Sequence, residues 1–164
     1  MPQKLIDLLP NKEEDWFKEL IKSFNDTLKL FSNLTEEQAY FKYAENKWTL
    51  KQLLDHLTEC EKIFNYRALR FTKNDGIALA SFDENLYVDN STANAQPLTI
   101  LIEEFKLTRL STIYFYGKLS HKDLQKTGIA NNQKYSVEYI VKHITQHNYH
   151  HLNIIKDRYL PQLS

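Results

Sequence analysis

KWTLKQLLDHLTECEKIFNYRALRF, residues 47–71, predicts one long helix. Thr49 followed three residues later by Gln52 resembles a capping box, in which both side chains bind free backbone N–H groups at a helix start. The apolar residues behind this start recur at helical spacing and predict a buried stripe: Leu50, Leu53, Leu54, Leu57, Phe64, Ala68 and Phe71. The residues KNDG at 73–76 are typical of a helix end.

Three further segments have the same periodicity. The first predicted helix covers about 12–31, with Asn11 as its cap and acidic residues in its first turn. Another covers about 97–119 and begins with a proline, which suits the first turn of a helix. The last covers about 136–159 and has a serine at its cap position.

The segments between these helices predict how they are arranged. Residues 32–47 and 120–135 are interpreted as connections. Residues 74–96 have no helical periodicity and form an unusually long connection between the second and third helices. The sequence therefore predicts an all-α four-helix bundle whose central pair is parallel because of this crossover. No change in composition marks a second domain, so residues 1–164 are expected to form one domain.

The composition argues against several functional classes. Lys and Arg total 21 and Asp and Glu total 21, so nothing in the net charge favours nucleic-acid binding. No apolar run reaches the ~18 residues that would span a membrane, and the N-terminus does not resemble a signal peptide. Cys60 is the single cysteine, which fits a reducing compartment. We expect a cytoplasmic protein, with Trp16 and Trp48 as packing residues.

The segment HITQHNYHHLNII, residues 143–155, contains four of the six histidines. Successive helix residues are rotated by about 100°, so each direction can be compared with Ile144 at the centre of the apolar stripe. By this rotation, His151 lies about 20° and His147 about 60° from the centre, both inside the stripe.

The other two histidines of this segment point elsewhere. His143 lies about 100° from the stripe centre, at its border, and His150 about 120°, outside it. His147 and His151 are thus predicted to face the bundle interior one turn apart, a spacing at which two histidines can chelate one metal ion.

His56 could supply a third nitrogen, because it lies at the edge of the stripe in residues 47–71. A three-histidine site leaves one coordination position open for water or substrate, as in catalytic metal sites. The spacing alone is equally compatible with hydrogen-bonded core histidines. Asn148 follows His147, where the zincin motif has its glutamate, so that motif is absent.

Residues 47–71, followed much later by HITQHNYHHLNIIKDRYL at 143–160, resemble the DinB-like superfamily, which includes bacillithiol-transferase-like bundles. The resemblance extends over nearly the whole chain and includes EEFKLTR at 103–109. It implies a four-helix bundle that holds a divalent metal through three histidines. Carried over to this chain, the ligands are His56, His147 and His151. Such nitrogen ligands favour zinc or nickel.

The family also implies a type of chemistry. Some members resemble thiol S-transferases and others metal-dependent hydrolases, in which a metal lowers the pKa of a bound thiol or water. The expected partners are a small-molecule substrate and, for a transferase, a low-molecular-weight thiol cosubstrate. Related sequences often read Gly-His-Glu where this chain has Gln146-His147-Asn148, so a flanking carboxylate is missing here. The catalytic residues stay unassigned.

Other residues have more than one interpretation. Glu61 is expected to form an ion pair with Arg109 across the bundle, the alternative being a role beside the site. Cys60 is either a small core residue, a fourth ligand or a reactive thiol. Asp83 and Glu84 in the crossover are either loop residues or the source of a base.

Three hypotheses for the whole protein follow. The first is a metal-dependent S-transferase or hydrolase. The second is a non-catalytic metal-binding or structural bundle with a closed coordination shell, and the third is an interaction module whose histidines are merely buried. An open metal position beside a cleft would separate the first from the second. Flat helix faces also make a homodimer a hypothesis.

Overall fold

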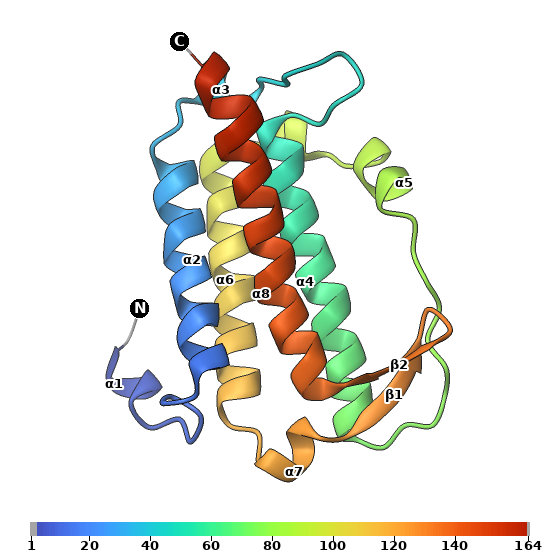
Figure 1. The fold of residues 1–164 in the computed structure, drawn as a ribbon. Helices are drawn as coiled ribbons and strands as arrows, with labels where there is room; N and C mark the ends of the chain where they lie inside the picture. Colours follow the sequence, from blue (N-terminus) through green and yellow to red (C-terminus); the bar gives the residue numbers. More distant parts are fainter. Residues whose placement is uncertain (1–2, 164) are drawn as a thin grey trace.

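A computed structural model describes residues 3–163; Met1, Pro2 and Ser164, at the ends of the predicted domain, lie outside the described residues. Four long helices form a bundle (Figure 1). They are α2 (Asp15–Ser32), α4 (Leu50–Thr72), α6 (Leu98–Gly117) and α8 (Val137–Ile154). α2 and α4 each pack against both α6 and α8. The predicted four-helix bundle is confirmed, with a small hairpin added to it.

The helices do not simply alternate in direction. α2 and α8 run one way and α4 and α6 the other (Figure 1). Pairs between α4 and α6 advance together along both helices, since Lys62 meets Glu104 and Asn65 meets Thr112. The central helices are therefore parallel, as predicted. The crossover that joins them runs along the outside of the bundle and contains two short helices, α5 (Glu84–Asp89) and η1 (Ala93–Ala95).

Side-chain caps mark the starts of two of the long helices, Thr49 at α4 and Ser136 at α8. At the start of α4, the Thr49–Gln52 capping box is present as predicted. The predicted cap of the first helix is wrong, because α2 begins at Asp15 with Glu14 at the N-cap position. The Asn11 side-chain amide instead donates two 2.9 Å hydrogen bonds to the carbonyls of Tyr116 and Leu119. The last carbonyls of a helix have no N–H donor within the helix, and the Asn11 side chain provides donors at the end of α6.

Short elements occupy the remaining segments. They are α1 (Gln3–Ile6), α3 (Glu36–Ala39) and α7 (His121–Leu124), the strands β1 (Thr127–Ala130) and β2 (Gln133–Ser136), a π-helical turn η2 (Ile155–Tyr159) and a final turn η3 (Leu160–Gln162). The two strands pair antiparallel. Asn131 and Asn132 form their turn with φ angles of 50° and 58°, as a two-residue type I′ hairpin requires.

The β1–β2 hairpin is docked against the end of α4. A Cβ atom at Gly128 would lie 2.0 Å from the Phe71 ring, so the strand can approach this closely only with glycine. On its other edge, Ala130 forms a single parallel bridge with Leu79 of the crossover. The hairpin is thereby held beside α4 and α8, where it forms one wall of the site described below.

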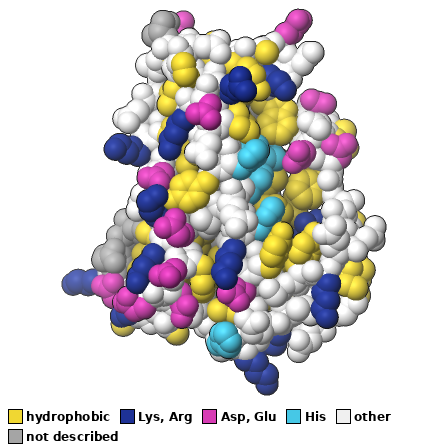
Figure 2. All heavy atoms as spheres, viewed as in Figure 1, with side chains coloured by type: hydrophobic (Ala, Val, Ile, Leu, Met, Phe, Trp, Pro, Cys, Tyr) yellow, Lys and Arg dark blue, Asp and Glu magenta, His cyan; other side chains and the backbone are white. Residues whose placement is uncertain are grey.

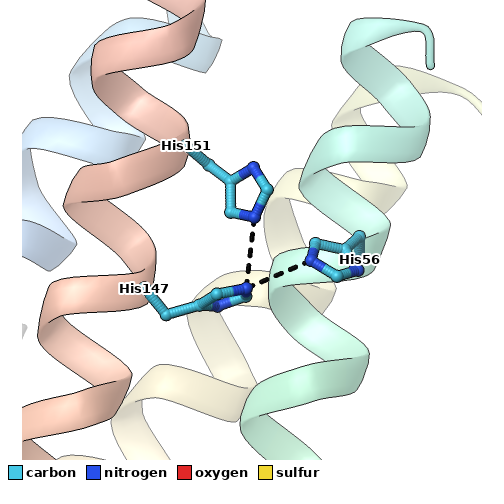
Figure 3. Close-up of side chains that lie close together, drawn as sticks. All are labelled: His56, His147 and His151. Carbon is cyan, nitrogen blue, oxygen red and sulfur yellow. Dashed lines mark hydrogen bonds between the residues drawn. The ribbon is translucent and has the colours of Figure 1, made fainter. Parts of the chain in front are cut away.

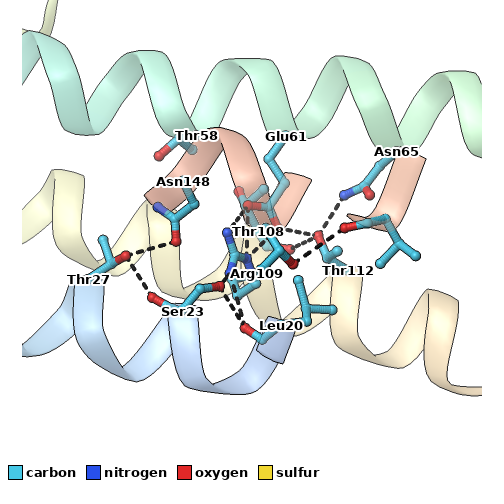
Figure 4. Close-up of polar contacts among 12 residues, drawn as sticks. Leu20, Ser23, Thr27, Thr58, Glu61, Asn65, Thr108, Arg109, Thr112 and Asn148 are labelled. Atoms are coloured by element: carbon cyan, nitrogen blue, oxygen red, sulfur yellow. Dashed lines mark hydrogen bonds and ion pairs between the residues drawn. The ribbon is translucent and has the colours of Figure 1, made fainter. Parts of the chain in front are cut away.

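One polar cluster is enclosed by the apolar core (Figure 4). The predicted pair between Glu61 and Arg109 is confirmed, and only 2% and 1% of these residues are exposed. Arg109 Nε lies 2.8 and 2.9 Å from the two carboxylate oxygens of Glu61. Arg109 Nη1 donates to Ser23 Oγ at 2.7 Å and to the Leu20 carbonyl at 3.2 Å, which ties three helices together.

Within residues 3–163, none of the helices combines the length and hydrophobicity needed to cross a bilayer.

Candidate metal centre

Three histidine side chains meet between α4 and α8 (Figure 3). His147 and His151 project from α8 one turn apart, and His56 projects toward them from α4. The Nε2 atom of His147 lies 3.1 Å from Nε2 of His56 and 3.1 Å from Nε2 of His151. The structure therefore brings the three predicted ligands together, with their potential ligand atoms within 4.8 Å of one another.

The other histidines lie where the rotation placed them. His150 is exposed, and His143 is partly buried one turn before His147 on α8. His121 is exposed at the start of α7. The interior pair was thus correctly separated from its neighbours by helix geometry alone.

Hydrogen bonding cannot satisfy this arrangement of nitrogens. A neutral imidazole has one N–H donor and one acceptor nitrogen. Nε2 of His147 faces two other Nε2 atoms and can form one well-directed hydrogen bond with them, whichever tautomer it adopts. A cation shared by the three atoms would accept a lone pair from each. Tetrahedral zinc with Zn–N distances of about 2.0–2.1 Å would separate its nitrogen ligands by about 3.3 Å, close to the 3.1 Å from His147 Nε2 to each of its two neighbours.

The histidines are also in the correct protonation state for a ligand. Burial lowers the pKa of His56 to about 4, of His147 to about 2 and of His151 to about 3, and the neighbouring histidines contribute to the shifts of the last two. All three rings are neutral at pH 7 because a charged imidazolium would be poorly solvated here. Their lone pairs are therefore available, as metal binding requires.

Two further side chains touch this cluster. The Trp48 ring lies 4.8 Å from the ring of His56 and is stacked 6.4 Å from that of His151, so this packing residue packs on the predicted ligands themselves. Cys60 Sγ is 3.6 Å from Nδ1 and 3.8 Å from Nε2 of His56. Burial raises the pKa of the Cys60 thiol to about 12, so it is protonated at neutral pH. Within the described residues, the convergent group comprises the three histidines without Cys60.

A cavity of about 370 Å³ opens beside His147. α4 lines it with Cys60, Phe64 and Arg67, and the crossover adds Phe82 and Glu84. We call this cavity the main cleft. In Figure 2, histidine side chains reach the surface in the middle of the molecule, with hydrophobic side chains around them. The site is thus open to small molecules rather than sealed in the core.

The opposite wall of the main cleft is a ladder of aromatic rings. Tyr135 of the hairpin stacks on Tyr139 with ring centroids 5.1 Å apart. Tyr139 stacks on His143 at 5.9 Å, and His143 on His147 at 6.1 Å. Residues four apart on α8 share one face of the helix, which aligns these rings. The ladder leads from the hairpin to the three histidines.

A second, smaller cavity of about 200 Å³ lies on the His151 side. Trp48 lines it, together with Asn85 of α5. The neighbouring residue of α5, Glu84, lines the main cleft, so this short helix contributes to both cavities. Asp83 has a structural role, since its carboxylate accepts hydrogen bonds from the first backbone N–H groups of α5.

Comparison with protein families identifies the fold. Residues 19–155 match the model of the DinB superfamily. The chain belongs to this superfamily. No curated protein is significantly similar to it in sequence. Among solved structures, it resembles YfiT from Bacillus subtilis, which is described as a "probable metal-dependent hydrolase with an unusual four-helix bundle topology". The TM-score is 0.78 with 14% sequence identity, covering 90% of this chain and 86% of YfiT.

One position in this DinB-superfamily chain departs from the pattern expected from its relatives. Asn148, where the family resemblance leads us to expect a carboxylate, is only 1% exposed. Its Oδ1 accepts a 3.0 Å hydrogen bond from Thr27 of α2, while His147 beside it faces α4. In this chain, position 148 therefore contributes to the contact with α2.

Sequence reasoning missed several residues of the main cleft in this DinB-superfamily member. Arg67, Tyr135 and Tyr139 were not singled out, yet all three line it. A signal was available for two of them. Tyr139 is two turns before His147, and Arg67 follows His56 by 11 residues, close to three full turns on one face. Tyr135 could not be found this way because it depends on the docking of the hairpin.

Proposed function

We propose that this protein is a metal-dependent enzyme acting on a small molecule, with His56, His147 and His151 holding one divalent ion. The observation that carries this proposal is the convergence of three neutral imidazole nitrogens beside an open cleft. Nitrogen ligands of this kind favour zinc or nickel. When bound, such an ion would supply Lewis acidity and lower the pKa of a water or thiol in its open position.

The protein's own residues would orient the substrate. The rings of Phe64, Tyr139 and Tyr135 provide flat apolar walls that exclude water from the reacting group. Glu84 and His143 line the same cleft and are the proton-accepting side chains that a bound substrate would meet. Burial lowers the pKa of His143, so its ring is neutral at pH 7 and able to accept a proton.

Hydrolysis and thiol transfer are the two reactions that fit this site. Hydrolysis needs water and one substrate, for which the main cleft suffices. Transfer needs an electrophile together with a low-molecular-weight thiol. The second cavity at His151 favours transfer, because the three histidines lie between two cavities that could each receive one reactant.

Activity of the metal-loaded protein tests this proposal. Chromogenic carboxylic esters would assay hydrolysis, and a thiol with an electrophile that becomes fluorescent on thioether formation would assay transfer. Metal-dependent turnover in either assay, lost in His147→Ala and kept in His150→Ala, is expected. If the metal-loaded wild-type protein turned over no faster than His147→Ala in both assays, the result would favour the non-catalytic bundle.

A further inference from the structure

Among the buried and half-buried arginines of residues 3–163, Arg67 stands out because it has no acidic partner. Arg109 is paired with Glu61, and Arg70 is paired with Asp75. In the described part of the chain, Arg67 makes no such ion pair; its Nη2 donates a 2.9 Å hydrogen bond to the Ala80 carbonyl. A guanidinium carries five N–H donors, so most of the hydrogen-bonding capacity of Arg67 is left over.

This cation lies in the same cleft as His147. Both residues line the 370 Å³ cavity, and the positive charge of Arg67 contributes to lowering the pKa of His143 between them. Burial of Arg67 lowers its own pKa, which indicates that the charge is incompletely solvated. Glu84 also lines this cleft and, within the described residues, forms no ion pair with Arg67.

The spacing along α4 defines the size of what could bind. His56 and Arg67 are 11 residues apart, which corresponds to about 16 Å along the helix axis at about 1.5 Å per residue. Helical side chains lean toward the N-terminus, so a ligand that joins Arg67 to the histidines would span less than this distance, within the cavity that Arg67 and His147 both line. The Phe82 ring, 5.5 Å from the guanidinium carbon, and the Phe64 ring line the intervening space with apolar surface.

We propose that Arg67 is the specificity-determining residue of the main cleft and selects substrates that carry a carboxylate on an aromatic or apolar body. The carboxylate would form a bidentate pair with the guanidinium, and the body would lie against the aromatic ladder with its reactive bond toward the histidines. This inference rests on the proposed function in taking the main cleft as the substrate site.

Binding of a matched pair of probes tests this role. The probes are 3-phenylpropanoate and 3-phenylpropanamide, which differ in charge but hardly in shape. Titration of the metal-free protein avoids direct binding of the carboxylate to an ion. We expect the carboxylate to bind more tightly than the amide, and Arg67→Gln to weaken carboxylate binding roughly tenfold while leaving the amide unchanged.

Three controls make the result specific. Arg158→Gln removes an exposed arginine of the last helical turns and should leave carboxylate binding unchanged. Arg67→Lys keeps the charge without the planar fork and should retain part of the preference. Circular dichroism would verify that each variant is folded.

The outcomes separate this inference from the proposed function. Equal binding of both probes, absence of carboxylate binding, or unchanged carboxylate binding in Arg67→Gln would overturn the role of Arg67. Metal content is measured on the same variants, and Arg67→Gln should keep its metal. If the wild-type protein binds no metal, that result would instead contradict the three-histidine site, whatever the probes show.

Discussion

The bundle contains two groups of polar side chains, and they differ in how their hydrogen bonds are satisfied. In the Glu61–Arg109 cluster, the guanidinium binds both carboxylate oxygens, a serine hydroxyl and a backbone carbonyl (Figure 4). At the three histidines, identical nitrogen atoms face one another and cannot all be paired (Figure 3). The Glu61–Arg109 cluster finds its hydrogen-bond partners within the protein, whereas the three histidines lack a partner for at least one of their nitrogen atoms.

This difference indicates which group is structural and which is functional. Buried polar groups in native proteins are almost always paired, so a convergent set that is not paired calls for an external partner. The Glu61–Arg109 cluster holds α2, α4 and α6 together. We propose that the histidines, which lie beside open cavities, bind a ligand that the chain itself does not supply.

The largest expected effect is on stability, from breaking the structural cluster. Arg109→Ala would leave the Glu61 carboxylate buried without its cation, and should lower the free energy of unfolding by about 3–5 kcal/mol. Urea denaturation followed by circular dichroism would measure it. Lys106→Ala, which breaks the exposed pair with Glu103, is the matched control and should cost at most about 1 kcal/mol. Similar losses in both variants would mean that the buried cluster is not the structural centre of the fold.

The second prediction concerns the histidines, where a substitution should affect metal binding strongly and stability less. His147→Ala should lower metal affinity by more than about 100-fold. Loss of a residue that only hydrogen-bonds to a metal ligand already costs about 10–100-fold, and loss of the ligand itself should cost more. It should destabilise the metal-free protein less than Arg109→Ala does. Isothermal titration with zinc would measure affinity, with His150→Ala as the control that keeps it. Equal loss of affinity in the two histidine variants would contradict the assignment of helix faces.

The third prediction uses the pH dependence of the metal-free protein. The folded-state pKa values of His56, His147 and His151, about 4, 2 and 3, are below the ordinary histidine value of 6.5. Below pH 6.5 the unfolded chain therefore takes up protons that the folded chain refuses, and stability falls as the pH falls. Each histidine contributes a slope of up to about 1.4 kcal/mol per pH unit between its two pKa values.

Unfolding measured between pH 7 and pH 5 would reveal this slope. His147→Ala should show a shallower dependence than the wild-type protein, because one of the contributing groups is removed. Replacement of the exposed His150 should leave the slope unchanged. An identical slope in His147→Ala would show that its ring is not held neutral by burial.

The smallest expected effect is that of Cys60→Ala. Because the thiol lies beside His56 but outside the convergent group, the variant should keep its metal and lose about 1 kcal/mol of stability, an ordinary cost for a core substitution. Metal analysis and thermal unfolding would measure both. Loss of metal in Cys60→Ala would make Cys60 a ligand and would favour a closed, non-catalytic site.

Much of the fold follows from sequence periodicity and capping. The apolar stripe of residues 47–71 and the Thr49 capping box define α4, and the length of the 74–96 segment requires the parallel central pair. The hairpin was missed because its strands are four residues each and its turn is Asn131-Asn132 without glycine. The misplaced cap at Asn11 depends on a contact with the distant end of α6, which no local pattern reveals.

The candidate site also contains residues that the local sequence predicts and residues that depend on how distant segments pack. The rotation of α8 was sufficient to select His147 and His151 from four neighbouring histidines, because direction on one helix is a local property. His56 was suggested as a third ligand by its place at the edge of the stripe in residues 47–71, and the family resemblance pointed to the same residue; the structure places it opposite the pair. The walls that come from the crossover and the hairpin could not be predicted, since the contributions of Phe82 and Tyr135 depend on where these segments pack.

Metal content measured by elemental analysis is the most direct test of the central claim that the three histidines form a metal site. The protein should be purified without a polyhistidine tag, alongside His56→Ala. We predict about one divalent ion per chain, as expected for a mononuclear site, and its loss in His56→Ala. Absence of metal after reconstitution with zinc or nickel, or equal metal in the variant, would contradict the three-histidine site.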